Sequence, residues 1–410
     1  MKTKAKINAN TIQPQPQVHT LFPHQERAVK EAQILLDKYG FVYIQGQPRV
    51  GKSLIAHTLA PNALVVTKKN AINDWLKYTQ KVINYEQISK YNPRDYDDIV
   101  IIDEAHNLGC RGKASKRVKE LRTFCYNKRV IFLSGTPYIE TPLSIYHQLY
   151  VTKYSPFNHL KNFYEFFRAF GIPSPIHIYG RNIESYAKHK DALIPIIDTH
   201  AIKVTYEDAG FKYQNYDKRI EVPATEAYRM SYKKIINEGV VANETINNVA
   251  MALHQYEGGF WNDNRKFRNA PKVDWLWQFV NDNLNKHKND TNFKIAIMAY
   301  FKAEQVNIAR AFKEYPNVVV LSAYKYCEGV DLSDYSMYIL YSFGYSGAKF
   351  VQLRDRIVNL NKDKRTEVLI PLIKDSICEA VYASVSKKRN FNKATFNQNL
   401  QNNKLSKVVI

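Results

Sequence analysis

Cysteine is scarce in this chain. Only 4 cysteines occur among 410 residues, and they are scattered along it, at Cys110, Cys125, Cys327 and Cys378. No Cys-x-x-Cys pair and no His/Cys cluster has the spacing of a metal site, which excludes a zinc module of the usual kind. We interpret the four side chains as reduced thiols of a cytosolic protein.

Long apolar segments are also missing. No run of about 18 apolar residues occurs, which argues against a membrane span. Residues 1–20 lack the apolar stretch of a signal peptide, and residues 1–19 are polar and contain Pro14 and Pro16. We expect 1–19 to be a flexible arm, and the protein to be cytoplasmic with no membrane partner.

Acidic residues are too few to balance the basic ones. Lys and Arg number 59 against 38 Asp and Glu, which leaves a net charge of +21. Such an excess attracts polyanions, so we favour a nucleic acid partner over the alternative of a solvated basic surface. Hydrophobic residues make up 45%, enough for real cores, and 410 residues exceed what one core usually supports. We therefore expect two globular domains.

What the sequence does contain is an alternation of short apolar runs with amphipathic segments. The apolar runs are typical of buried parallel strands and lie at 41–45, 63–67, 99–103, 129–134, 294–299, 318–322, 337–342 and 366–371. The amphipathic segments predict helices at 24–39, 71–82, 272–284, 302–315 and 375–389. This alternation is typical of βαβ units and predicts parallel sheets covered by helices.

The pattern divides the chain into two α/β lobes. We place the first lobe at 20–150 and the second at 271–395, with a polar tail at 396–410. Residues 151–270 contain few strand-like runs and are rich in Tyr and Phe, so we expect a mainly helical insertion and linker there.

The segment GQPRVGKS (46–53) matches the phosphate-loop pattern G-x-x-x-x-G-K-[ST] between a predicted strand and a predicted helix. Gly46 and Gly51 let the backbone wrap closely around a triphosphate, with N–H groups facing the anion. Lys52 would reach the β- and γ-phosphates, and the Ser53 hydroxyl would bind Mg²⁺. The sequence therefore predicts a site for ATP and Mg²⁺.

Two adjacent acids end the apolar run 99–103. Asp103 and Glu104 follow buried aliphatics, and the carboxyl edge of an open α/β sheet is where catalytic groups are expected. Asp103 would hold Mg²⁺ through water, and Glu104 would orient and deprotonate the attacking water. A solvated loop is the alternative, and the preceding strand disfavours it.

With GQPRVGKS, DEAH (103–106) and SGTP (134–137), the sequence resembles superfamily 2 helicases of the Swi/Snf-like branch, in its short phage and bacterial form. The resemblance implies two RecA-like lobes, ATP hydrolysis with Mg²⁺, and the cytoplasm of a bacterium or phage-infected cell. Gln25 resembles the glutamine that recognises adenine, with a helix-start surface residue as the alternative. Likeness to the branch's second motif implies contacts to the nucleic acid backbone from Thr67, Lys68 and Lys69, and leaves Trp75 as packing.

The second half carries three further likenesses, to motif IV at 294–301, motif V at 322–334 and motif VI at 350–361. They imply that Gly329 and Asp331 face the nucleotide, that Ser322 lies near the nucleic acid, and that Gln352 and Arg356 complete the catalytic site. Motif VI usually has a second arginine three positions after the first, and here that position is Asn359. Arg356 or Arg354 then takes the arginine's role, or hydrolysis is slow, or the register differs by a turn.

These features predict an ATP-dependent motor, and we favour a duplex DNA translocase over an unwinding helicase because no extra strand-separating domain is evident. Two alternatives remain open. An RNA-directed helicase would share every nucleotide motif, and a catalytically weak nucleic-acid-binding protein would explain Asn359.

Overall fold

The structure is a computed structural model of the 410-residue chain. It describes residues 20–138, 141–178, 181–211, 216–241, 246–261, 265–266, 270–324, 335–355, 367–387, 389–392, 395–396 and 398–399. The expected arm at 1–19 and nearly all of the tail at 396–410 lie outside the described residues.

The first lobe is built on a six-stranded sheet with the order β3-β2-β4-β5-β1-β8. All neighbouring strands in it are parallel. The strands are β1 (Phe41–Gly46), β2 (Leu64–Thr67), β3 (Val82–Asn84), β4 (Ile99–Ile102), β5 (Arg129–Ser134) and β8 (Ala201–Val204).

Helices cover both faces of this sheet, because alternate strand residues point to opposite sides. On one side, Val42 and Ile44 pack in a core with α1 (Pro23–Tyr39), α2 (Lys52–Leu59) and the short α3 (Ile72–Trp75). On the other side, Phe41 and Tyr43 pack in a core with helices α4 (Lys116–Cys125), α5 (Ile145–Leu149), α6 (Phe163–Phe170) and α7 (Leu193–Asp198). The nearly continuous apolar runs seen in the sequence follow from this two-sided burial.

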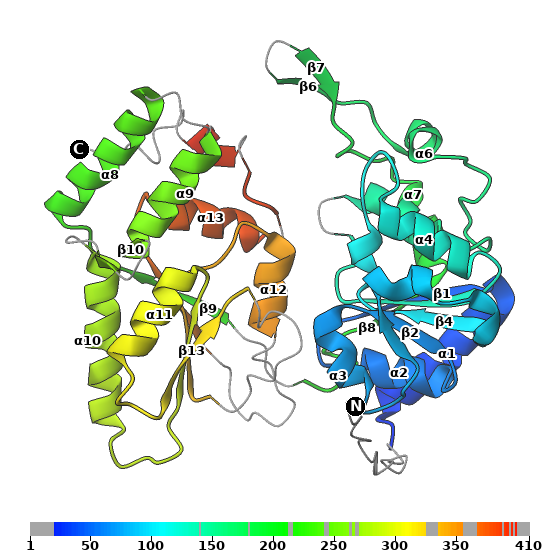
Figure 1. Ribbon diagram of the computed structural model, residues 1–410, viewed down its shortest axis with the longest axis horizontal. Helices are drawn as coiled ribbons and strands as arrows, with labels where there is room; N and C mark the ends of the chain where they lie inside the picture. Colours follow the sequence, from blue (N-terminus) through cyan, green and yellow to red (C-terminus); the bar gives the residue numbers. More distant parts are fainter. Residues whose placement is uncertain are drawn as a thin grey trace, which may run out of the picture.

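The second lobe has a five-stranded parallel sheet with the order β13-β12-β14-β15-β9. Its strands are β9 (Tyr216–Glu221), β12 (Ile295–Ala299), β13 (Val318–Ser322), β14 (Met337–Leu340) and β15 (Glu367–Leu372). One face packs against α10 (Pro271–Lys286) and α11 (Lys302–Ala311). The other packs against α8 (Glu226–Val241), α9 (Ile246–Glu257), α12 (Gly347–Asp355) and α13 (Ile377–Val385). Figure 1 shows the two lobes side by side. The predicted α/β class, with two parallel sheets flanked by helices, is confirmed.

The segment 151–270, which we expected to be a mainly helical insertion and linker, contains α6, α7, α8 and α9 and also contributes strands that we did not expect. It supplies β8 to the first sheet and β9 to the second. Both strands lie at sheet edges, where one side is unpaired, and most side chains of β9 are exposed or only half-buried. Such strands lack the continuous apolar run that marks a central strand, which is why the pattern missed them. The same segment forms two small antiparallel hairpins, β6 (Pro175–Ile178) with β7 (Arg181–Glu184) and β10 (Phe260–Trp261) with β11 (Arg265–Lys266).

The helix predicted over 71–82 is also shorter than expected. It ends at Trp75, and the chain enters edge strand β3 at Val82. Trp75 is buried and its indole N–H donates to Asp103, so a tertiary contact sets the end of this helix and overrides the helical periodicity. Among the described residues, none of the helices combines the length and the apolar composition that a bilayer crossing needs.

Candidate nucleotide site

The phosphate loop joins β1 to the first residue of α2. Arg49 and Gly51 both have positive φ, at 67° and 88°, in the region where side chains are costly. A Cβ on Gly51 would lie 2.1 Å from Gln25 Nε2, and one on Gly46 would lie 2.6 Å from Lys52 Cγ. Close packing therefore favours glycine at both positions, and at Gly51 the backbone conformation favours it as well.

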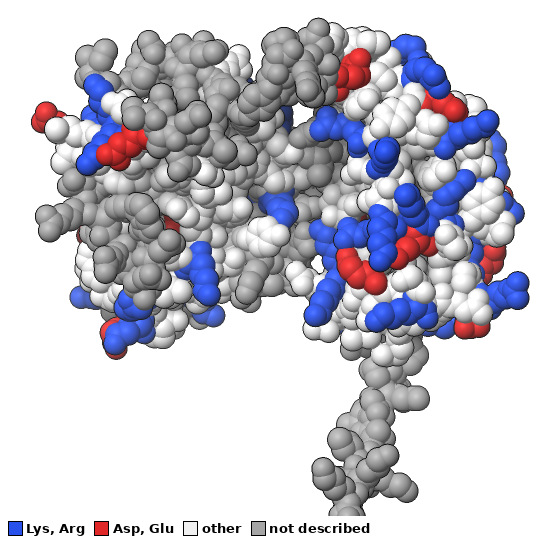
Figure 2. All heavy atoms as spheres, turned by 45° about the horizontal axis from the view of Figure 1, so that its top comes forward, with Lys and Arg blue, Asp and Glu red and all other residues white. Residues whose placement is uncertain are grey.

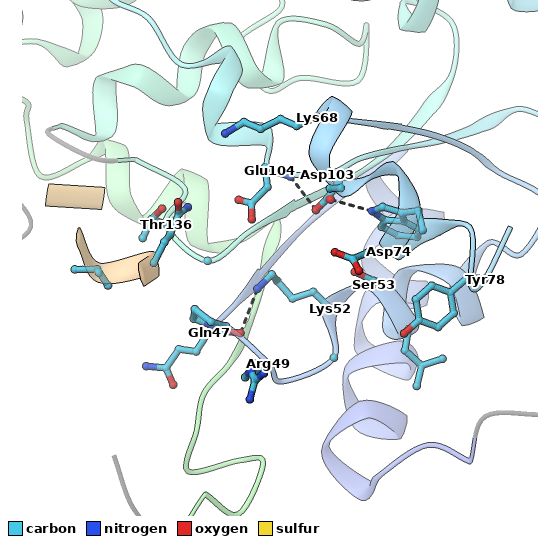
Figure 3. Close-up of a pocket in the computed structure, with 18 residues that line it drawn as sticks. Gln47, Arg49, Lys52, Ser53, Lys68, Asp74, Tyr78, Asp103, Glu104 and Thr136 are labelled. Carbon is cyan, nitrogen blue, oxygen red and sulfur yellow. Dashed lines mark hydrogen bonds between the residues drawn. The ribbon is translucent and has the colours of Figure 1, made fainter. Parts of the chain in front are cut away.

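The side chain of Lys52 folds back onto the phosphate loop. Its ammonium group donates to the carbonyl oxygens of Gly46 at 2.8 Å and Gln47 at 3.2 Å. Figure 3 shows this ammonium and the carboxylate of Glu104 facing the same central space. Lys52 is thus positioned at the start of a helix whose unpaired N–H groups favour an anion.

The carboxylate of Asp103 is held by a set of donors at the end of β4. Its Oδ2 atom accepts from the hydroxyl of Thr67 and from the indole N–H of Trp75, each at 2.9 Å. Its Oδ1 atom accepts from the backbone N–H of Glu104 at 2.9 Å. Tyr85 donates its hydroxyl to the Asp103 backbone carbonyl. These bonds fix the acid at the edge of the sheet, beside the phosphate loop.

The pKa values of the two acids are shifted in opposite directions. Burial, together with the charge of Glu104, raises the pKa of Asp103 above its ordinary value. Burial would also raise the pKa of Glu104, but the adjacent imidazole of His106, with the charges of Lys52 and Lys68, outweighs it and lowers that pKa to about 2. Glu104 is therefore a carboxylate at neutral pH, able to accept a hydrogen bond from water.

A short chain of contacts links Glu104 to the end of β5. Glu104 adopts a left-handed conformation with φ 50°, which for a non-glycine residue stores strain of the kind that occurs at functional sites. Nδ1 of the buried His106 lies 3.2 Å from Glu104 Oε2 and 2.9 Å from Ser134 Oγ. Ser134 Oγ in turn accepts from the Thr136 N–H at 3.1 Å. The DEAH and SGTP segments are therefore in direct contact.

The loop, the acid pair and part of the second lobe share one pocket of about 260 Å³. From the first lobe its lining includes Lys52, Ser53, Asp103 and Glu104, and from the second it includes Gln352 of α12. The remaining lining residues are Gln47, Pro48, Arg49, Gly51, Leu54, Lys68, Ala71, Asp74, Trp75, Tyr78, Gly135, Thr136 and Val351.

Oxygen ligands for Mg²⁺ are present in this pocket. The Ser53 hydroxyl and the Asp103 carboxylate are hard donors that suit this ion. The described residues contain no cluster of three or more His, Cys, Asp or Glu that could hold a metal by themselves. That donor set fits an ion that keeps several waters and takes its remaining ligands from substrate phosphates.

Gln25 does not line the pocket. Its side chain is buried behind the phosphate loop, where Nε2 donates to the Val50 carbonyl at 3.2 Å and Oε1 accepts from the Phe22 N–H at 3.1 Å. In this arrangement Gln25 supports Gly51 and the loop rather than presenting its amide to a base.

The three residues nominated as nucleic acid contacts after β2 are in different environments. Thr67 is fully buried and its hydroxyl is used by Asp103, so its side chain offers nothing to a phosphate in this structure. Lys68 lines the pocket described above, and only Lys69 is exposed.

The second-lobe predictions are described only in part. Gly329, Asp331, Arg356 and Asn359 lie outside the described residues. Ser322 ends β13, where its hydroxyl accepts from Gln305 Nε2 at 3.2 Å. Arg354, the other arginine considered for the cleft, pairs with Asp217 of β9 at 3.3 Å and so is engaged within its own lobe.

Several lining residues were not singled out from the sequence. Arg49 lies inside the phosphate loop, at a position where the motif accepts any residue. Asp74 and Tyr78 reach the pocket from α3 and just after it. They are four residues apart in the helix predicted over 71–82, just after the loop of Thr67 to Lys69. This spacing could have suggested that both lie on one face of that helix.

No protein-family model and no curated protein matches the chain. Among solved structures, a Sulfolobus solfataricus SWI2/SNF2 ATPase core in complex with dsDNA is similar, with a TM-score of 0.42 and 14% identity over 95% of each chain.

Proposed function

We propose that this chain is an ATP hydrolase that couples turnover to movement along a nucleic acid, with DNA favoured over RNA. One observation carries the proposal: the phosphate loop, the acid pair and Gln352 of the second lobe line the same pocket. A nucleotide bound there would contact both lobes, so its binding would favour an arrangement in which the lobes close around it. Loss of the γ-phosphate would remove some of these contacts and let the lobes separate.

The residues have distinct parts in this scheme. Lys52 would exchange its carbonyl partners at Gly46 and Gln47 for the β- and γ-phosphates. Ser53 and Asp103 would hold Mg²⁺, which neutralises charge on the phosphates when bound. Glu104, ionised and fixed by its strained backbone, would orient the attacking water.

Charge supports a nucleic acid partner. The chain has a net charge of +21, and on the face drawn in Figure 2 blue Lys and Arg side chains predominate over the first lobe. The basic helix α4, which contains Lys116, Arg117 and Lys119, belongs to this lobe. Contacts of this kind grip phosphates rather than base edges, so we expect salt-sensitive binding with little sequence specificity.

ATP turnover is the first test. Phosphate release should be measured with duplex DNA, single-stranded DNA, RNA and no nucleic acid, at one fixed salt concentration. Lys52→Ala should reduce kcat roughly 100-fold or more, because it removes a positive charge from the developing transition state. Lys30→Ala, at an exposed lysine on α1, is the matched control and should behave as wild type.

Four outcomes decide among the alternatives. Stimulation by DNA above that by RNA supports the proposal, and the reverse supports an RNA-directed helicase. If nucleic acid does not stimulate ATP turnover and Lys52→Ala behaves as wild type does, the chain is a binding protein with a degenerate site. Efficient displacement of strands from long blunt duplexes would reject our preference for a duplex translocase.

A further inference from the structure

A second pocket, of about 340 Å³, lies at the carboxyl ends of the second sheet. Its walls include Tyr300, Tyr324 and Phe343, which follow strands β12, β13 and β14. Strand β12 lies between β13 and β14, so the chain runs from β12 to one neighbour and then crosses to the other side. The crevice outside such a switch in strand order is where open α/β sheets bind ligands.

Aromatic rings dominate this pocket. Tyr324 is 54% exposed, and its ring centroid lies 6.4 Å from that of Tyr300 in a T-shaped arrangement. Tyr300 packs closely against Gly344, where a Cβ would lie 2.6 Å from the tyrosine ring. Phe343, Tyr345, Phe350 and Phe391 complete the aromatic lining. An exposed tyrosine at the edge of a rigid aromatic wall is suited to stack against a flat ring.

The charge of the lining residues further restricts which class of ligand could bind in this pocket. Lys349 is the one charged residue among the lining residues described, and its ammonium lies 3.8 Å from the Tyr324 ring centroid. None of the described lining residues carries a carboxylate. The positive charge of this lysine would repel a cationic ligand, so the pocket is not an aromatic cage of the kind that binds cations. A flat ring that carries a nearby negative charge fits both features, and a nucleobase with its phosphate is such a group.

The pocket also adjoins the first lobe. Asn390 lines it and, at the same time, lines a neighbouring pocket formed by first-lobe residues that include His106 and Arg111. The backbone of Gly347 donates to Asn390 Oδ1 at 3.0 Å, which fixes this residue to the start of α12. A strand that passes between the lobes would therefore meet the aromatic wall beside the DEAH segment.

We propose that this pocket holds an unpaired base of a nucleic acid strand, stacked on Tyr324, with the adjoining phosphate beside Lys349. The proposal rests on the nucleic acid function proposed above and refines it. A base can enter only when it is outside the helical stack, so the preferred substrate has a single-stranded segment, as at a fork or junction.

The test compares oligonucleotides with and without bases. Binding of a fluorescent 12-nucleotide oligothymidylate and of its abasic counterpart should be measured by anisotropy at fixed salt. Tyr324→Ala should weaken binding of the oligothymidylate roughly tenfold and leave binding of the abasic strand unchanged. Tyr324→Phe keeps the ring and should bind as wild type does. ATP turnover without nucleic acid should be the same in all variants.

Tyr126 supplies a matched control. It is 39% exposed, and the guanidinium of Arg122 lies 4.8 Å from its ring centroid, but it belongs to the first lobe. Tyr126→Ala should therefore leave both affinities unchanged.

Each contrary result has its own meaning. If Tyr324→Ala binds the oligothymidylate as well as wild type does, the stacking proposal is overturned while the motor proposal stands. The same holds if this variant loses as much affinity for the abasic strand as for the oligothymidylate. Tight binding of thymidine monophosphate that depends on Tyr324, with oligonucleotide binding unchanged, overturns it in favour of a free-nucleotide site. If wild type binds no nucleic acid, both proposals fail.

Discussion

Replacing Thr67 by valine removes one donor from the Asp103 carboxylate and almost nothing else. The threonine is fully buried, and its hydroxyl donates to Asp103 Oδ2 at 2.9 Å. A hydrogen bond to a charged group contributes roughly 1.5–3 kcal/mol, and a tenfold change in a proton equilibrium corresponds to about 1.4 kcal/mol. The pKa of Asp103 is already raised by burial and by Glu104, so a lost donor raises it further.

The expected consequence is a displaced pH profile. Asp103 must be ionised to hold Mg²⁺, so the acid limb of kcat/KM for ATP should move upward by roughly one pH unit or more in Thr67→Val. The half-saturating Mg²⁺ concentration should rise at the acid end and return toward the wild-type value at high pH. Steady-state phosphate release across pH and Mg²⁺ concentration measures both.

Tyr85→Phe is the control for this experiment. Tyr85 is as deeply buried as Thr67, but its hydroxyl donates to the backbone carbonyl of Asp103 and not to the carboxylate. Its removal should change the thermal stability without moving the acid limb. If both variants move the limb equally, or neither does, then ionisation of Asp103 does not limit the reaction and our reasoning about its donors is refuted.

Two further predictions concern stability. Burial raises the pKa of Glu304 from 4.5 to about 7. The contribution of Glu304 to stability is therefore complete below pH 4.5 and is lost as the pH rises through 7. Relative to wild type, Glu304→Gln should gain roughly 3 kcal/mol in unfolding free energy between pH 4.5 and 8, and a constant difference in denaturant titrations would contradict this. Gly51→Ala should cost more than Gly210→Ala, because both glycines have positive φ but only at Gly51 does a Cβ meet another atom, 2.1 Å away at Gln25; equal melting temperatures would show that the loop yields to the clash.

The central strands were predictable because burial on both faces makes them continuously apolar. The run predicted at 129–134 coincides with the central strand β5, and the run at 41–45 falls within β1. The edge strands β8 and β9 were not predictable, since an edge strand is not constrained to be apolar along its whole length.

The same limit applies to the candidate site. Motif spacing pointed to Lys52, Ser53, Asp103 and Glu104, and the structure brings all four to one pocket. The hydrogen bonds of Thr67 and Trp75 to Asp103 depend on how β2 and α3 lie beside β4, and no local pattern encodes that. Gln25 likewise matched a motif, while its buried position behind the loop depends on tertiary packing.

Strand β8 gives the phosphate loop a mechanical connection that its motif does not reveal. Val204 lies beside Gly46 in the sheet, and its carbonyl accepts from the Gln47 N–H at 2.9 Å. The edge strand of the other sheet begins at Tyr216, only 216 − 204 = 12 residues later, a length that spans at most about 40 Å. The second lobe is thus tethered at the base of the loop itself. Any swing of that lobe would therefore pull on the strand that lies beside Gly46, so lobe movement and the shape of the phosphate loop are mechanically linked.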